Sequence, residues 1–177
     1  HNLQSLRVVD RLEERYPAFD GLNLCFEMRE GILKHCSAAN ARRLVAREPG
    51  GVGQRFLDRT QPSLEAQLCN LADEIAYNAH DVDDGVRSGL IQLEQLEEVP
   101  LFKRFLTETL AEHPRLGGRR LLFESIRRML SEQVYDVLRS TEQALASASP
   151  GSADEARAAP PLVCFSMSMA EESTSLK

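Results

Sequence analysis

The sequence predicts an all-α protein, and three observations support this fold class. Apolar residues recur every three or four positions through most of the chain, which is the period of an amphipathic helix. The 177 residues include only 10 glycines and 8 prolines and no tryptophan, which argues against a turn-rich β architecture. Apolar residues make up 42% of the chain, enough for an ordinary globular core.

The formal net charge of −6 argues against a general nucleic-acid coat. No run approaches the ~18 apolar residues of a membrane span, so no membrane partner is expected.

The first third of the chain predicts two helices and a basic, less regular region. Apolar residues from 3 to 12 recur at helical spacing, and Pro17 marks the end of that helix. A second helix is expected over 22–35, with four core candidates, Leu22, Phe26, Ile32 and Leu33. Residues 37–62 are expected to be irregular, with a flexible loop at 49–53 and five arginines, Arg42, Arg43, Arg47, Arg55 and Arg59. We expect these arginines to pair with the acidic helix that follows; attraction of an anionic substrate and contact with a neighbouring subunit are the alternatives.

Four further helices are expected in the middle of the chain. The strongest covers 63–88, where Ser63 can cap the first turn and Glu65 places negative charge in it. A short helix over 93–98 and a longer one over 100–113 follow. The last runs over 119–146 and buries one stripe, made of Leu122, Ile126, Met129, Leu130, Val134, Val137 and Leu138.

Residues 1–146 are thus expected to form one partial helical domain, and the Ala/Ser/Pro-rich stretch 147–161 a flexible linker. Residues 162–177 begin a C-terminal segment, whose apolar run at 162–166 suggests one strand or a docking segment. The chain opens at His1 without a Met and closes without a terminating signal, so we expect a piece of a longer protein. The four cysteines, Cys25, Cys36, Cys69 and Cys164, form no C-x-x-C pair, which is typical of reduced thiols in a cytoplasmic protein.

The expected helix over 63–88 carries two different faces. One is an apolar seam suited to burial, made of Leu64, Leu68, Leu71, Ile75, Ala79, Val82 and Val86. The second face carries Asp73, Tyr77 and Asp81. At 100° per residue, Asp73 lies about 200° around the axis from Ile75, so the second face cannot share the contacts of the seam. It must meet water, another protein layer or a functional site.

The charge along this helix leaves two interpretations open. Six acidic residues lie between Arg59 and Arg87 with no Lys or Arg among them, so they lack the support of ion pairs at i±4. A solvated acidic face is the simpler interpretation. The alternative is a functional site, because Tyr77 lies between carboxylates at i−4 and i+4. A rigid helix would hold a metal ligand, a flat packing surface and a hydroxyl acceptor in one row.

The segment LADEIAYNAHDVDDG, residues 71–85, resembles the deoxyguanosine triphosphate triphosphohydrolase family of HD-domain metal phosphohydrolases, particularly its bacterial dGTPase-like branch. The segment HNLQSLR, residues 1–7, looks like the H-N-x-Q-S segment of that family, and residues 21–24 with 29–35 look like its next block. Further matches lie at 62–67, 87–91, 119–122, 126–129 and 161–166. The resemblance therefore covers nearly the whole chain apart from 147–161, and it implies a helical HD-type domain.

The family reaction is attack of water on the α-phosphorus of a deoxynucleoside triphosphate, which yields the deoxynucleoside and intact triphosphate. The resemblance implies a divalent cation, Mg²⁺, Mn²⁺ or Fe²⁺, held by two histidines and two aspartates, and Asp73 matches the fourth ligand. Tyr77 matches the tyrosine that packs on the sugar and leaves no room for a 2′-hydroxyl. Asp81 matches the acceptor of the 3′-hydroxyl, and Lys34 matches a cation that contacts the triphosphate.

The first residues match a segment that lines the α-phosphate region. His1 matches a histidine that supports catalysis in some family members, and Asn2 and Gln4 follow it as substrate-binding candidates. The other three metal ligands belong to an H…HD motif that should lie before His1, and the His80-Asp81 dipeptide comes after the Asp73 position. With one of the four expected ligands, the chain alone is expected neither to hold the metal tightly nor to turn over substrate.

Two other functions remain open on the sequence. One is another HD-domain phosphohydrolase, a nucleotidase or a phosphodiesterase, and the other is a non-catalytic helical assembly module. The resemblance implies a homo-oligomer in the cytoplasm with a deoxynucleoside triphosphate as substrate. The family resemblance also leaves single-stranded DNA open as a partner, but no residue pattern in this sequence indicates it.

Overall fold

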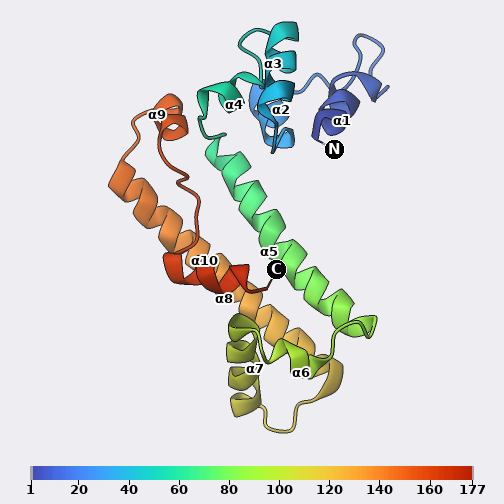
Figure 1. Ribbon diagram of the computed structural model, residues 1–177, viewed down its shortest axis with the longest axis vertical. Helices are drawn as coiled ribbons and strands as arrows, with labels where there is room; N and C mark the ends of the chain where they lie inside the picture. Colours follow the sequence, from blue (N-terminus) through green and yellow to red (C-terminus); the bar gives the residue numbers. More distant parts are fainter. Residues whose placement is uncertain (1, 177) are drawn as a thin grey trace. The chain divides into compact units, whose positions relative to one another are not determined.

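The computed structural model describes the backbone of residues 2–176 and the side chains of residues 3–176. The helices labelled in Figure 1 are α1 (Asn2–Arg7), α2 (Phe26–Ile32), α3 (Ala38–Arg47), α4 (Gln54–Asp58), α5 (Leu64–Arg87), α6 (Leu93–Leu96), α7 (Pro100–Glu112), α8 (Gly118–Ala148), α9 (Ala153–Ala158) and α10 (Met167–Thr174). The π-helical turn η1 (Val8–Leu12) directly follows α1. No strand occurs in this described range, so the all-α fold class is confirmed. Within the same range, no helix combines the length and the hydropathy needed to cross a membrane.

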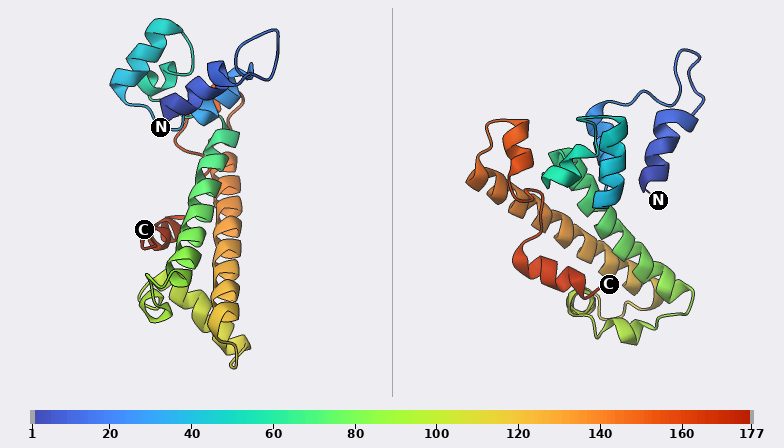
Figure 2. Two further views of the ribbon diagram at one scale, coloured as in Figure 1. Left: turned by 90° about the vertical axis from the view of Figure 1, so that its right-hand side faces the viewer. Right: turned by 45° about the horizontal axis from the view of Figure 1, so that its top comes forward.

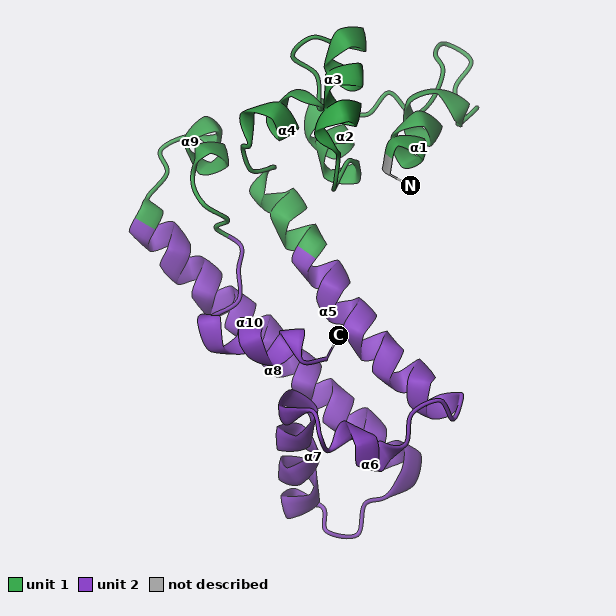
Figure 3. Ribbon diagram, viewed as in Figure 1, with its two compact units in different colours: residues 1–70, 148–162 green, residues 71–147, 163–177 purple. Residues whose placement is uncertain are grey.

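Two compact units share the chain, and each takes its residues from two separate segments (Figure 3). Unit 1 comprises His1–Asn70 and Ala148–Leu162, and unit 2 comprises Leu71–Ser147 and Val163–Lys177. Each unit has an apolar core of its own.

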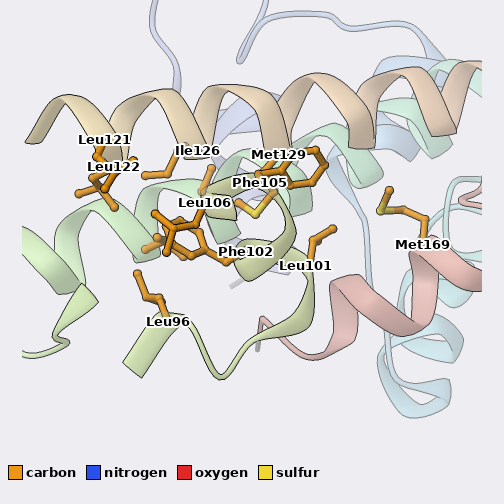
Figure 4. Packing of buried hydrophobic residues seen from close by; sticks show 12 residues of the cluster. Leu96, Leu101, Phe102, Phe105, Leu106, Leu121, Leu122, Ile126, Met129 and Met169 are labelled. Atoms are coloured by element: carbon orange, nitrogen blue, oxygen red, sulfur yellow. The ribbon is translucent and has the colours of Figure 1, made fainter. Parts of the chain in front are cut away.

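Unit 2 has a continuous apolar core to which five helices contribute side chains (Figure 4). Its centre consists of Leu101 and Phe102 of α7 and Met129 of α8, all fully buried. In both views of Figure 2, α6 and α7 lie beside the first turns of α8. The other buried members are Ala79 and Val82 from α5, Leu96 from α6, Phe105 and Leu106 from α7, Leu121, Leu122 and Ile126 from α8, and Met169 from α10.

Helix α5 forms where the sequence predicts it and buries three of the seven residues of the expected seam. Ser63 Oγ accepts a hydrogen bond from the Ala66 N–H at 3.3 Å, which satisfies one of the open donors of the first turn. Ile75 is buried along the seam, as are Ala79 and Val82 of the core. Leu68 was also expected there and is 49% exposed, so that expectation is wrong. The physical reason is that the first turns of α5 bury Ala66 and Gln67, so a different side of the helix is covered there from the side that carries Leu68.

Helix α8 confirms the expected long helix but turns a different face inward along its second half. Val134 and Leu138, expected to be buried, are 47% and 57% exposed. The buried positions there include two polar side chains, Gln133 and Asp136. Asp136 Oδ2 accepts a hydrogen bond from the Ser166 N–H at 2.8 Å, and Gln133 faces Ser173 of α10 at 3.4 Å. Hydrogen bonding to the segment around α10 therefore decides which side of α8 is covered.

Unit 1 has a smaller core, centred on Leu6 of α1, Leu33 just after α2 and Val52 before α4. Leu33 is confirmed as a core residue, with no exposed surface. Phe26, another core candidate, is 39% exposed, and the expectation for it is wrong. Because α2 begins only at Phe26, this ring lies on the first turn of a short helix, where the Arg157 guanidinium lies 5.7 Å from the ring centre.

The first helix ends before Pro17, as predicted, and a tight turn brings the chain back to it. Gly21 donates its N–H to the Glu13 carbonyl at 3.0 Å, and the Leu22 N–H reaches the Val9 carbonyl at 2.7 Å. Gly21 has φ +70°, and a Cβ there would lie 2.3 Å from the carbonyl carbon of Asp10. Only glycine fits this close approach of two backbones.

Helix α3 corrects the expectation of an irregular region over 37–62. Ser37 Oγ accepts the Asn40 N–H at 3.3 Å and caps the helix. Alanine and arginine, both strong helix formers, fill most of its ten positions, and Ala41 is buried. The loop expected at 49–53 is confirmed as a succession of turns between α3 and α4.

The segment after α8 is more ordered locally than its composition suggests. The stretch 147–161, expected as a flexible linker, contains α9, which Ser152 caps through its side chain. The Gln61 N–H donates to the Arg157 carbonyl at 2.8 Å, and the Leu162 N–H donates to Gln67 Oε1 at 3.0 Å. The strand suggested at 162–166 does not form, because side-chain acceptors take backbone donors that a strand would use in a ladder.

Candidate functional site

The second face of α5 presents three predicted site residues in one row at the surface of unit 2. Asp73, Tyr77 and Asp81, called the α5 row below, are all exposed, and the Tyr77 side chain is 65% exposed. Successive members lie four residues apart, which is about 6 Å along the axis, so the row spans about 12 Å. The prediction that this face stays out of the seam is confirmed. A tyrosine this exposed on a helix whose other side is packed has room for a planar group against its ring.

The remaining acidic residues near the end of α5 have a basic partner in the same helix. Arg87 pairs with Asp83 at 3.1 Å and lies 3.8 Å from Asp84. The expected lack of support at i±4 is therefore wrong for Asp83, because Arg87 follows it by one turn. These contacts assign Asp83 and Asp84 to the surface electrostatics of the helix end.

The other candidates belong to unit 1. His1 lies outside the described residues, and so does the side chain of Asn2, whose backbone begins α1. Gln4 is exposed on α1 and lines a cleft of about 570 Å³. Lys34 is half-buried and follows α2.

Arg55 fixes the backbone that carries Lys34. Its Nη2 donates to the Leu33 carbonyl at 3.0 Å and lies 3.5 Å from the Lys34 carbonyl. Its Nε lies 3.7 Å from the carboxylate of Glu30, which is fully buried. Burial lowers the pKa of the Arg55 guanidinium from its ordinary value, and the Glu30 charge acts in the opposite direction. The expected pairing of this arginine with the acidic helix is therefore wrong, since Arg55 pairs with α2.

Glu30 is the centre of a buried ion cluster that sequence reasoning missed. Arg157 Nη1 donates to both Glu30 oxygens at 2.7 Å, and the Ser63 N–H approaches Oε2 at 3.3 Å. The cluster thus connects α2 to α9 and to the residue that caps α5. No local pattern indicates this cluster, because the two principal partners are 127 positions apart.

Asp73 is the residue that the family resemblance gives as a ligand of the implied metal. Asp73 offers a carboxylate, which is the oxygen donor that hard divalent cations prefer. Across the part of the chain that the structure describes, no group of three or more His, Cys, Asp or Glu side chains is arranged to hold a metal ion. The described residues therefore do not by themselves form a metal centre. All four cysteines are free thiols.

Comparison with known proteins gives the chain clear relatives, although no family model matches it. It is 59% identical over 177 residues to a "Deoxyguanosinetriphosphate triphosphohydrolase-like protein" of Bordetella pertussis, which covers 100% of the chain and 45% of that protein. Proteins of the same name from Ralstonia nicotianae and Thiobacillus denitrificans are 60% and 56% identical over 177 residues, with 44% and 46% of their lengths covered. The chain thus spans a little under half the length of these curated relatives. Over all of its residues the chain is a homologue of the proteins named deoxyguanosinetriphosphate triphosphohydrolase-like, and the family resemblance seen in its sequence is confirmed.

Proposed function

We propose that the chain provides part of the active site of a metal-dependent deoxynucleoside triphosphate triphosphohydrolase. The observation that carries the proposal is the α5 row, in which an exposed tyrosine lies between two exposed carboxylates at helical spacing. The names of the relatives support a triphosphohydrolase class for the whole protein.

In this proposal, Asp73 supplies one oxygen ligand to a divalent cation, and the other ligands come from parts of the whole protein outside this chain. When bound, such a cation polarises a phosphoryl oxygen and lowers the pKa of the attacking water. Asp73 is suited to this role because α5 is held rigidly by its buried seam, so the carboxylate needs little further ordering.

The next two residues of the row recognise the sugar. The Tyr77 ring packs against C2′ of the deoxyribose, where a hydrogen fits and a hydroxyl does not. Asp81, one turn further, accepts a hydrogen bond from the 3′-hydroxyl. The ~12 Å length of the row is comparable with a nucleoside and its α-phosphate, so one helix can address the metal and the sugar together.

Lys34 contributes a positive charge for the triphosphate. Because an ammonium is a point charge, it stabilises phosphate oxygens without demanding one geometry. Arg55 and the Glu30 cluster fix the backbone on which Lys34 is carried.

The test is product analysis with the whole protein that contains this chain. Incubation with dGTP and Mg²⁺ or Mn²⁺, followed by ³¹P NMR, should show intact triphosphate and no orthophosphate. Asp73→Asn should lower the rate by about a hundredfold or more, since loss of a residue that only orients a metal ligand typically costs about 10–100-fold and this change removes a ligand itself. The matched control is Asp84→Asn on the same helix, which should retain the activity.

Three outcomes would contradict the proposal. Orthophosphate as the product would indicate a different HD-domain phosphohydrolase, and equal losses in Asp73→Asn and Asp84→Asn would indicate a general acidic face. Triphosphate release by the 177 residues alone would show that the metal site needs nothing outside them. Tyr77→Ala should also weaken the preference of the protein for dGTP over GTP. An unchanged preference would contradict the proposed packing of the Tyr77 ring against C2′.

A further inference from the structure

A cleft of about 570 Å³ in unit 1 gathers arginines from four helical elements. Arg7 and Arg11 come from α1 and η1, Arg29 from α2, and Arg43 and Arg47 from α3. The arginines of each pair are four residues apart, so they lie on one side of their helix, and like charges at that spacing repel each other. The segment α1–η1 and helix α3 thus each place two mutually repelling arginines at the same concave surface.

The two carboxylates of the cleft are already occupied. Arg29 donates to Asp10 through Nε at 2.9 Å and Nη2 at 3.0 Å, and to Glu48 through Nη1 at 2.8 Å and Nη2 at 2.7 Å. The hydrogen bond with Arg29 lowers the pKa of Glu48 from its ordinary value.

The other four arginines have no carboxylate partner within the described residues. Five arginines and two carboxylates leave a formal excess of three positive charges in the cleft, on a chain whose net charge is −6. A concave surface with low-dielectric walls concentrates the positive electrostatic potential of these charges, so it attracts anions. Arginines on a solvated basic face would have no need to line one cleft. Their convergence on this cleft therefore indicates an anionic ligand.

The shape and lining of the cleft favour a compact polyanion. Its volume falls within the range of small-molecule sites, about 300–1,000 Å³. Leu3, Leu6 and Leu44 supply an apolar floor, and the guanidinium groups match phosphate oxygens in a bidentate geometry. Among the described residues, the lining includes no aromatic ring on which the bases of single-stranded nucleic acid could stack.

We infer that this cleft binds a chain of phosphate groups, either free as inorganic triphosphate or carried by a nucleoside triphosphate. Binding here requires neither hydrolysis nor a metal ion, and no residue of the α5 row takes part in it. Arg43 and Arg47 contact the phosphate oxygens, while Arg29 stays engaged with Asp10 of η1 and with Glu48 at the end of α3 and so connects these two segments at the cleft.

The first experiment is calorimetric titration of the whole protein with inorganic triphosphate, with EDTA present to remove divalent cations. Arg43→Gln should weaken binding by about tenfold or more, as expected for the loss of a hydrogen bond to a charged group. The matched control is Arg42→Gln, which removes the same charge from the neighbouring position of α3 and lies outside the cleft. It should change the affinity by less than about twofold, and added salt should weaken binding in both cases.

Competing ligands distinguish the two sources of the phosphate chain. Tighter binding of dGTP than of triphosphate would identify a nucleotide, and equal affinities would identify the phosphate chain alone. Competition by deoxyguanosine, which has no phosphate, would overturn the inference. Equal weakening by Arg43→Gln and Arg42→Gln, or no binding of triphosphate at low salt, would overturn it as well.

A second measurement uses the unaltered protein, so the folding of variants does not affect it. Phenylglyoxal modifies accessible arginines, and peptide mass mapping reports the rate at each position. Triphosphate should protect Arg43 and Arg47 and leave Arg42 unprotected, whereas equal protection of all three would contradict the inference. The metal-free readouts also stay valid if the whole protein proves not to hydrolyse dGTP, so failure of one proposal is distinguishable from failure of the other.

Discussion

Glu30→Gln removes the only negative charge from the buried ion cluster of unit 1 while preserving the size of the side chain. Glu30 has no exposed surface, and Arg157 Nη1 donates to both of its oxygens at 2.7 Å. Breaking a buried ion pair from one side typically costs 3–5 kcal/mol, because the remaining charge stays buried without compensation. The Arg157 and Arg55 side chains keep 19% and 11% exposure, so some water reaches them, and we take the lower end, about 3 kcal/mol.

Urea unfolding and differential scanning calorimetry would measure this change. For a chain of this size, about 3 kcal/mol corresponds to a drop in Tm of roughly 6–12 °C. The matched control is Glu27→Gln, an exposed glutamate of the same helix, which should change stability by about 0.5 kcal/mol or less. A double change of Glu30 and Arg157 to methionine should cost less than Glu30→Gln alone, because it leaves fewer unpaired buried charges. A cost below about 1 kcal/mol for Glu30→Gln would refute the assignment of this cluster as a stabilising element of unit 1.

Three further outcomes follow from other parts of the molecule. Phe102→Ala should destabilise unit 2 by about 3–5 kcal/mol in urea unfolding, whereas Phe123→Ala, at a ring that is 40% exposed, should cost about 1 kcal/mol or less; similar costs would contradict the described core. Hydrogen bonds from its two arginine partners in α8 hold the pKa of Glu124 at about 2, below its ordinary 4.5. The stabilisation that the ionised Glu124 provides through these ion pairs is therefore complete above pH 4.5 and is lost as the pH falls toward 2. The difference in Tm between the unaltered protein and Glu124→Gln should shrink over that interval, and a constant difference would argue against the ion pairs. Burial raises the pKa of the Cys36 thiol, so iodoacetamide at neutral pH should label it more slowly than the exposed Cys69, as peptide mass mapping would show; equal rates would contradict its burial.

Helical periodicity predicts long helices well when they carry an apolar seam over many turns. Helices α5, α7 and α8 appear where the sequence indicates them, because local spacing and capping residues such as Ser63 act within a few positions. Helix α3 was missed because its many arginines suggested an irregular basic region. Its signals were present in the capping Ser37 and in the high helix propensity of alanine and arginine.

The extent of burial depends on partners that are distant in the sequence, and local spacing does not specify them. Val134 and Leu138 have the periodicity of a seam, yet Asp136 and Gln133 face the α10 segment instead. The same reasoning holds for Leu68, because the first turns of α5 bury Ala66 and Gln67 instead, and Gln67 accepts a hydrogen bond from the distant Leu162 N–H.

The candidate site shows the same division between local and distant information. The α5 row was predictable because its members lie on one helix, and the structure confirms that they share an exposed face. The arginine cleft was not predicted as a cleft, because its walls come from α1, α2 and α3, and their meeting depends on the turn at Gly21 and on the core around Leu33.

The bond between Glu30 and Arg157 has a consequence for the order in which the polypeptide acquires its structure during synthesis. The Glu30 carboxylate must wait until the ribosome has produced the Arg157 guanidinium, 127 positions later. The intervening stretch contains the α7 and α8 core, whose contacting residues are closer in sequence, so forming their contacts costs less loop-closure entropy. Unit 2 should therefore nucleate first, and the Glu30 segment should become protected from hydrogen exchange or protease later than α7 and α8 in a nascent chain.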